Sequence, residues 1–113
     1  MKKTLTHLPF TRYALKALGT QIAVARRELG WTAADLAQRL GVTAQLVSRI
    51  ERGAPSTTVG TVFEAAVLCG IPLFDTHPDD VRSMAAVAEN ERLRLALLPS
   101  RTRRRPVEVS SDF

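Results

Sequence analysis

One stretch of this sequence gathers hydrogen-bonding and cationic side chains at helical spacing. Residues 36–53 read LAQRLGVTAQLVSRIERG, and their apolar residues recur at helical spacing, which leaves the polar residues between them on another face. Gln45 can donate and accept hydrogen bonds at an adenine edge, and Arg49 can form a bidentate pair with a guanine. No acidic side chain interrupts this face. The predicted base-reading residues are Thr43, Ala44, Gln45, Ser48 and Arg49.

A single polar residue on an amphipathic helix is usually just solvated, so the prediction rests on the elements around this face. Thr32 and Thr43 each stand where they would cap a helix, and Gly41 separates the two short helices that they begin. The three-residue link GVT makes these helices cross steeply, as in a helix-turn-helix, and a glycine can adopt the positive φ of such a bend. The first helix would then hold the second rigidly and leave one of its faces free. This arrangement favours DNA binding over a merely solvated face.

Helical periodicity and helix-stop residues predict five helices along the chain. Thr32 with Asp35 three residues later forms a variant of the capping box, and glycines stand where the first four helices should end. The only strand-like run is the short PVEV at residues 106–109. The expected helices span residues 11–29, 33–40, 44–52, 59–69 and 79–98.

The segment RRELGWTAADLAQRLGVTAQLVSRIERG resembles the Cro/CI-type, or XRE-type, helix-turn-helix domain, and the resemblance covers residues 11–74. It implies an all-α fold: a five-helix, lambda-repressor-like DNA-binding domain with a flexible C-terminal tail. Such domains pair an arginine late in the first helix with the glutamate that ends the third, and these positions are Arg26 and Glu51. The base-reading positions of the family fall on Thr43, Ala44, Gln45 and Arg49. Its phosphate-contacting positions fall on Thr32, Gln38 and Arg52, and the nearby loop adds Ser56, Thr57 and Thr58.

Two positions depart from the pattern of this family. Many members have glutamine at the positions of Ala33 and Ala44, where one glutamine helps to clamp a phosphate and the other reads a base. Alanine cannot form these hydrogen bonds. We therefore expect fewer direct base contacts per monomer and a greater dependence on Gln45, Arg49 and dimerisation.

The C-terminal segment, residues 100–113, combines two kinds of chemistry. Its four arginines and two acidic residues supply +2 of the net charge of +5, and an arginine-rich arm suits DNA phosphates. The chain then ends in alternating valines, an acid and an aromatic residue, which suit strand addition or a protein pocket better than DNA. A solvated tail without a partner is the alternative. The predicted partner-binding residues are Val107, Val109, Asp112 and Phe113.

The expected organisation is an N-terminal arm (1–10), the helix-turn-helix domain (11–74), a C-terminal helix as candidate dimer interface (75–99) and the tail (100–113). A single such domain reads too few base pairs for typical operator affinity, so we expect a homodimer on double-stranded DNA with two half-sites. The alternative for the C-terminal helix is that its apolar stripe packs onto the first helix. The stripe comprises Val81, Met84, Ala85, Ala88, Leu95 and Leu98.

Two functions of different classes fit this organisation. The first is a stand-alone XRE-type repressor that blocks promoter access. The second is the autoregulating antitoxin of a HipA/HipB-type toxin–antitoxin operon, which binds and neutralises a kinase-like, HipA-like toxin. The stretch TVFEAAVLCGIPLFD and the arginine-rich tail ending in SSDF resemble the corresponding parts of such antitoxins. Fold and motif do not by themselves separate the two functions.

Other classes of function find little support in the sequence. His7 and His77 have no partner at metal-ligand spacing, and Cys69 has no nearby histidine, so neither a metal site nor a nucleophile is expected. Adjacent Asp79 and Asp80 suit a helix start better than acid–base catalysis. We therefore expect no enzyme activity and no cofactor. The single cysteine and the lack of a signal-like or membrane-spanning apolar run lead us to expect a cytoplasmic protein.

Overall fold

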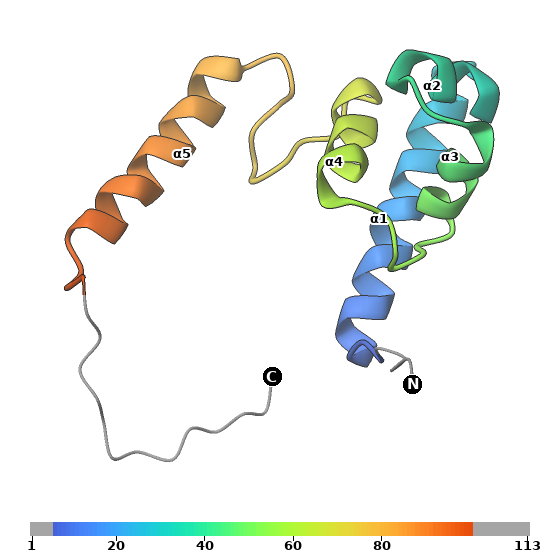
Figure 1. The fold of residues 1–113 in the computed structure, drawn as a ribbon. Coiled ribbons are helices and arrows are strands. Elements are labelled where there is room, and N and C mark those ends of the chain that lie inside the picture. Colours follow the sequence, from blue (N-terminus) through green and yellow to red (C-terminus); the bar gives the residue numbers. More distant parts are fainter. Residues whose placement is uncertain (1–5, 101–113) are drawn as a thin grey trace. The chain divides into compact units, whose positions relative to one another are not determined.

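The computed structural model describes residues 6–100, which contain five α-helices (Figure 1). Within these residues no strand forms beyond one isolated bridge between Leu73 and Thr76. The predicted all-α, five-helix fold is therefore confirmed. The chain divides into two compact units, Met1–Pro78 and Asp79–Phe113. The helices are α1 (Pro9–Glu28), α2 (Ala33–Leu40), α3 (Ala44–Glu51), α4 (Val59–Leu68) and α5 (Val81–Ala96).

Local sequence signals account for most of these helix ends. α1 begins earlier than expected, at Pro9, because a proline in the first turn loses no intrahelical hydrogen bond. The capping box of α2 is confirmed: the Thr32 hydroxyl accepts from the Asp35 N–H at 3.0 Å, and the Asp35 carboxylate accepts from the Thr32 N–H at 2.8 Å. Gly41 ends α2 at φ 74°, the left-handed conformation predicted for the bend. The Thr43 hydroxyl then caps α3 by accepting from the Leu46 N–H at 3.1 Å.

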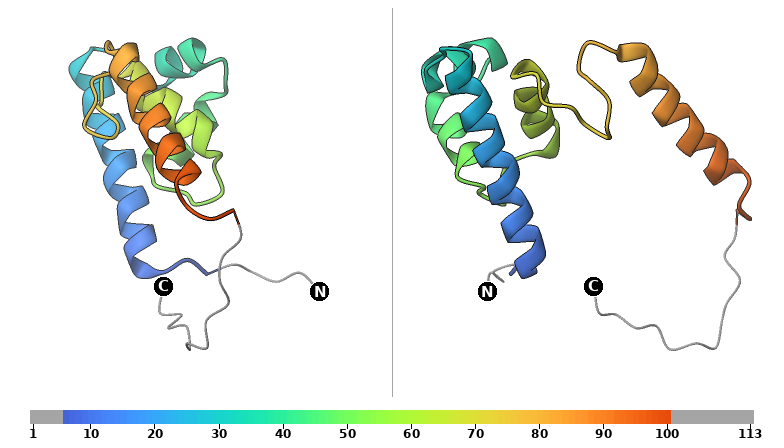
Figure 2. Two further views of the ribbon diagram at one scale, coloured as in Figure 1. Left: turned by 90° about the vertical axis from the view of Figure 1, so that its left-hand side faces the viewer. Right: turned by 180° about the vertical axis from the view of Figure 1, so that it is seen from behind.

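The core of the first unit lies among α1, α2, α3 and α4. Its three largest fully buried side chains are Ile22, Leu36 and Val47, one from each of the first three helices. Cys69 is buried in the core just after the last residue of α4. Its burial raises the pKa of its thiol, which lowers the reactivity of a cysteine. The first turns of α1 extend beyond the other helices of this unit in all views (Figures 1 and 2).

Apolar residues of α4 and α5 are more exposed than their helical periodicity alone would predict. The apolar positions that predicted α4 include Val59, Phe63 and Val67, yet these three side chains are 67%, 36% and 36% exposed. The buried face of α4 uses Val62 and Ala66, which belong to the same predicted apolar pattern, together with Ala65. α5 buries none of its residues. Within residues 6–100, no helix is both long and apolar enough to cross a membrane.

A close approach of backbones sets the distance between α1 and the end of α3. A Cβ added to Gly19 would lie only 2.7 Å from the carbonyl oxygen of Glu51, which is inside van der Waals contact. Glycine at this position lets α1 touch the last turn of α3 directly. The sequence pattern did not predict this contact, because a glycine such as Gly19 inside a helical segment indicates only a weak helix former.

Candidate nucleic-acid interface

The face of α3 that was predicted to read DNA is accessible in the structure. Val47 and Ile50 bury the other face of this short helix. Four predicted reading residues are exposed, namely Thr43, Ala44, Gln45 and Ser48, whereas Arg49 is half-buried. The Thr43 hydroxyl accepts from the Leu46 N–H as the helix cap, so its own O–H proton and its methyl group are left for a base. Together these side chains offer hydrogen-bond donors, acceptors and a cation on one helix face.

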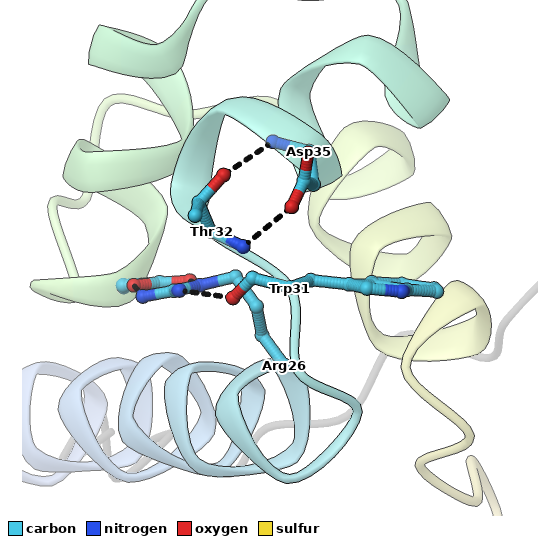
Figure 3. A network of polar contacts seen from close by, with 5 residues as sticks. Arg26, Trp31, Thr32 and Asp35 are labelled. Atoms are coloured by element: carbon cyan, nitrogen blue, oxygen red, sulfur yellow. Dashed lines mark hydrogen bonds and ion pairs between the residues drawn. The ribbon is translucent and has the colours of Figure 1, made fainter.

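Arg26 fastens the end of α3 to α1, as the family resemblance implied. Its guanidinium donates from Nε and Nη2 to the two carboxylate oxygens of Glu51, at 2.7 and 2.9 Å. Nη1 donates to the backbone carbonyl of Trp31 at 2.8 Å (Figure 3). The hydrogen bonds to Glu51 raise the pKa of Arg26, although burial opposes this shift. The two side chains are 8% and 12% exposed, so this bidentate pair joins α1 to α3 with little of either side chain open to solvent.

The link between α1 and α2 is held by the same arginine and by an aromatic contact. Trp31 packs against the core, and the guanidinium carbon of Arg39 lies 4.1 Å from its ring centroid. This distance is typical of a cation–π interaction. Figure 3 shows Arg26 reaching the Trp31 carbonyl directly beside the capping box of Thr32 and Asp35. The start of α2 is therefore fixed to the end of α1.

The N-terminus of α2 was predicted to meet a phosphate through Thr32. In the structure both the N–H and the hydroxyl of Thr32 are already bonded to Asp35, whose pKa these hydrogen bonds lower. The Thr32 hydroxyl only accepts in this capping box, so its own proton and the N–H groups of Ala33 and Ala34 are the donors left for a phosphate. The Asp35 carboxylate at the same helix start would oppose such an anion, and the phosphate contact through Thr32 stays a prediction.

The loop after α3 lies against the reading face. Nη2 of Arg49 donates to the hydroxyl of Ser56, which joins a predicted base-reading residue to a predicted phosphate-contacting residue. In the same loop the Thr57 hydroxyl donates to the Ala54 carbonyl at 3.2 Å, and that of Thr58 donates to the Thr61 hydroxyl at 2.8 Å. The hydroxyls of Thr57 and Thr58 are thus engaged within the protein.

Two further residues that were predicted to contact phosphate lie outside this loop. Gln38 is exposed on α2, and Arg52 is exposed at the C-terminal cap of α3. The four predicted partner-binding residues, from Val107 to Phe113, lie outside the described residues. Sequence reasoning missed the contact between Arg49 and Ser56 and the one between Trp31 and Arg39. Arg49 and Ser56 are separated by the turn after α3, and Trp31 and Arg39 by most of α2, so neither pair stands at a spacing that helical periodicity would single out.

Two comparisons with known proteins place the chain in a family. A family model described as "Helix-turn-helix domain" matches residues 17–78, which include α2, α3 and most of α1. A curated relative from Sinorhizobium fredii, the "Uncharacterized HTH-type transcriptional regulator y4dJ", is 38% identical over 56 residues. The match covers 50% of this chain and 73% of that protein. The chain belongs to the helix-turn-helix domain family.

Proposed function

We propose that this protein is a sequence-specific DNA-binding transcriptional repressor of the XRE type. The observation that carries the proposal is the face of α3, where Gln45, Ser48 and Arg49 stand on a helix fastened at its far end by the buried Arg26–Glu51 pair. A rigid helix with donors and acceptors on its free face is what readout in a major groove requires. The relative named an HTH-type transcriptional regulator agrees with this role.

Selection from a randomised DNA library tests the proposal. The purified protein is incubated with random duplexes, the bound fraction is sequenced over several rounds, and the affinity for the enriched site is measured by gel shift. Gln45→Ala or Arg49→Ala should then cost about 1–3 kcal/mol at that site and flatten the preference at one base pair. Arg52→Ala serves as the comparison, because loss of a phosphate contact weakens all sequences alike. Failure to enrich any sequence would refute the proposal.

The proposed repressor acts as a homodimer. α5 is the one helix in the described part of its unit, and it carries Leu93 and Leu95 at 47% and 69% exposure. An isolated helix of this length is marginally stable in water, so a partner surface would stabilise it. A symmetric dimer would place its two half-sites about 34 Å apart, or a multiple of that distance. Light scattering after size exclusion measures the mass, and a monomer at micromolar concentration would refute the dimer.

Two sequence features favour a second candidate function. This function is neutralisation of a HipA-like kinase toxin together with autoregulation of the operon. The two features are the antitoxin-like stretch at residues 61–75 and the mixed basic and apolar tail. We expect deletion of residues 106–113 to change operator affinity by less than about threefold, or under 1 kcal/mol, while it abolishes capture of the toxin. Deletion of residues 100–113 should also lower the salt dependence of DNA binding.

The material for this test is the product of a kinase-like gene adjoining the one that encodes this chain. Pull-downs with each truncation are run beside gel shifts at two salt concentrations. If the shorter deletion destroys DNA binding while capture of the kinase survives, the tail serves the dimer or the operator. Absence of any adjoining kinase-like gene favours the stand-alone repressor.

A further inference from the structure

We infer that Ser56 positions Arg49 for base reading, so that a residue outside the recognition helix sets how sharply one base pair is discriminated. The inference rests on the proposed DNA-binding function and gives Ser56 a role different from a phosphate contact. It follows from the hydrogen bond between Nη2 of Arg49 on α3 and the Ser56 hydroxyl on the following loop.

Ser56 can orient a side chain because the loop that carries it is itself fixed. The Gly53 and Ala54 N–H groups donate to the carbonyls of Ile50 and Arg49, each at 3.0 Å, which ties the loop to the last turn of α3. A Cβ on Gly53 would lie 2.8 Å from the backbone of Lys16, so the loop also lies directly against α1. The Thr57 hydroxyl closes the loop on the Ala54 carbonyl. The acceptor therefore has a defined place relative to the helix.

The chemistry of this contact suits positioning without loss of charge. A hydroxyl accepts a hydrogen bond from a guanidinium but does not neutralise it, and among residues 6–100 Arg49 forms no ion pair with a carboxylate. A guanidinium has five N–H donors, so donors remain for the two acceptors of a guanine after one is given to Ser56. In contrast, Arg26 donates from Nε and Nη2 to Glu51 and from Nη1 to the Trp31 carbonyl, so all three of its guanidinium nitrogens are engaged.

The other predicted readers on this face are less restrained. Gln45 and Ser48 are exposed, and their side chains make no hydrogen bond within the part of the chain that the structure describes. Arg49 is the half-buried member of the set, and its guanidinium donates a hydrogen bond to the Ser56 hydroxyl of the loop. A long side chain that is ordered before binding loses less conformational freedom when it meets a base, and this favours the matching base over the others. We therefore place the sharpest base preference at the pair that Arg49 contacts.

The test is a double-mutant cycle on the operator enriched from the random library. Affinities of the wild type, Ser56→Ala, Arg49→Ala and the double variant are measured on this duplex and on three duplexes that differ only at the base pair Arg49 reads. Ser56→Ala should weaken binding to the preferred base about two- to tenfold, the range of one hydrogen bond, and leave the other three duplexes nearly unchanged. In the Arg49→Ala background the same substitution should have no further effect. Ser56→Thr, which keeps the hydroxyl, should restore the preference.

A measurement without DNA separates positioning from any direct contact of Ser56 with the operator. The NMR order parameter of the Arg49 Nε–H should fall in Ser56→Ala and recover in Ser56→Thr, while the Arg26 Nε–H serves as an internal reference. Equal weakening of all duplexes by Ser56→Ala, additive with Arg49→Ala, would show a phosphate contact and overturn the inference. An unchanged affinity or an unchanged order parameter would overturn it as well. If the wild type enriches no sequence, the proposed function falls together with the inference, whereas the other negative results leave that function intact.

Discussion

Two arginine–glutamate pairs in this chain show how differently the same chemistry acts in two regions. Arg26 and Glu51 join α1 to the end of α3, are separated by 25 residues and are 8% and 12% exposed. Arg92 and Glu89 lie one turn apart on α5 and are 63% and 53% exposed. Both pairs have a shortest N–O distance near the strong end of hydrogen bonding, 2.7 and 2.6 Å. Distance is therefore not what distinguishes them.

The difference lies in what each pair would leave behind if it were broken. An exposed pair on one helix exchanges its partner for water, and it contributes little because solvent screens it. A buried pair leaves an uncompensated charge in a place where water cannot reach. The α1–α3 junction is thus a tertiary constraint that holds α3, while the pairs of α5 join residues one turn apart and support that helix only locally.

The strongest test of this contrast is to remove the acid from each pair. Glu51→Ala should lower the free energy of unfolding by about 3–5 kcal/mol, because Arg26 would remain buried with only the Trp31 carbonyl as partner. Glu89→Ala, the matched surface variant, should change it by less than about 1 kcal/mol. Urea unfolding followed by tryptophan fluorescence suits this test, since Trp31, the only tryptophan, packs against the core. Coincident curves for the two variants would contradict the contrast.

The second test adds one methyl group at two helical glycines. Gly19→Ala places a Cβ in steric conflict with backbone oxygens at the end of α3. The helices must therefore separate, at a cost of about 1–3 kcal/mol. Gly60→Ala meets nothing within 4 Å and should stabilise α4 by about 0.5–1 kcal/mol. Thermal melts should thus shift in opposite directions. A stabilising Gly19→Ala would show that α1 and α3 pack more loosely than described.

The third test compares helix caps in the two units. Thr32→Ala removes the capping box of α2 and should lower stability by about 1 kcal/mol, seen by tryptophan fluorescence because α2 belongs to the core. Asp80→Ala removes the acceptor for the Ser83 N–H at the start of α5. We expect this variant to reduce the helical circular dichroism signal and leave the fluorescence transition in place. A shared shift of both signals would instead indicate that α5 unfolds together with the first unit.

The smallest expected effect is a dependence on pH. Hydrogen bonds from Thr32 lower the pKa of Asp35 below its ordinary value of 3.8, and the hydrogen bonds from Arg92 lower that of Glu89 below 4.5. A carboxyl group whose pKa is lowered by folding stabilises the folded state at pH values above its ordinary pKa. This stabilisation is lost as the pH falls through the lowered pKa of the folded state. The stability advantage of the wild type over Asp35→Asn should therefore be constant near neutrality and shrink below pH 3.8. Urea titrations of both proteins between neutral and acidic pH measure it, and an advantage that grows on acidification would contradict the assignment.

Much of the fold followed from local residue chemistry. The caps at Thr32 and Thr43, the glycine bend at Gly41 and the spacing of apolar residues predicted the helices of the first unit to within about a turn, because each signal acts over one turn of backbone. The pattern was less informative for α4, where Val59, Phe63 and Val67 are exposed. Apolar periodicity shows which residues share a face, but it does not show which of two apolar faces meets the core.

The composition of the reading face follows from local sequence, since a helix of known start and period places Gln45, Ser48 and Arg49 on the side away from Val47 and Ile50. How that face is held depends on two tertiary contacts. These are the direct contact of Gly19 with the end of α3 and the hydrogen bond from Arg49 to Ser56. Both contacts join residues that are distant along the chain or separated by a turn. The path of the chain between such residues depends on the packing of the whole core, which no local pattern of residues encodes.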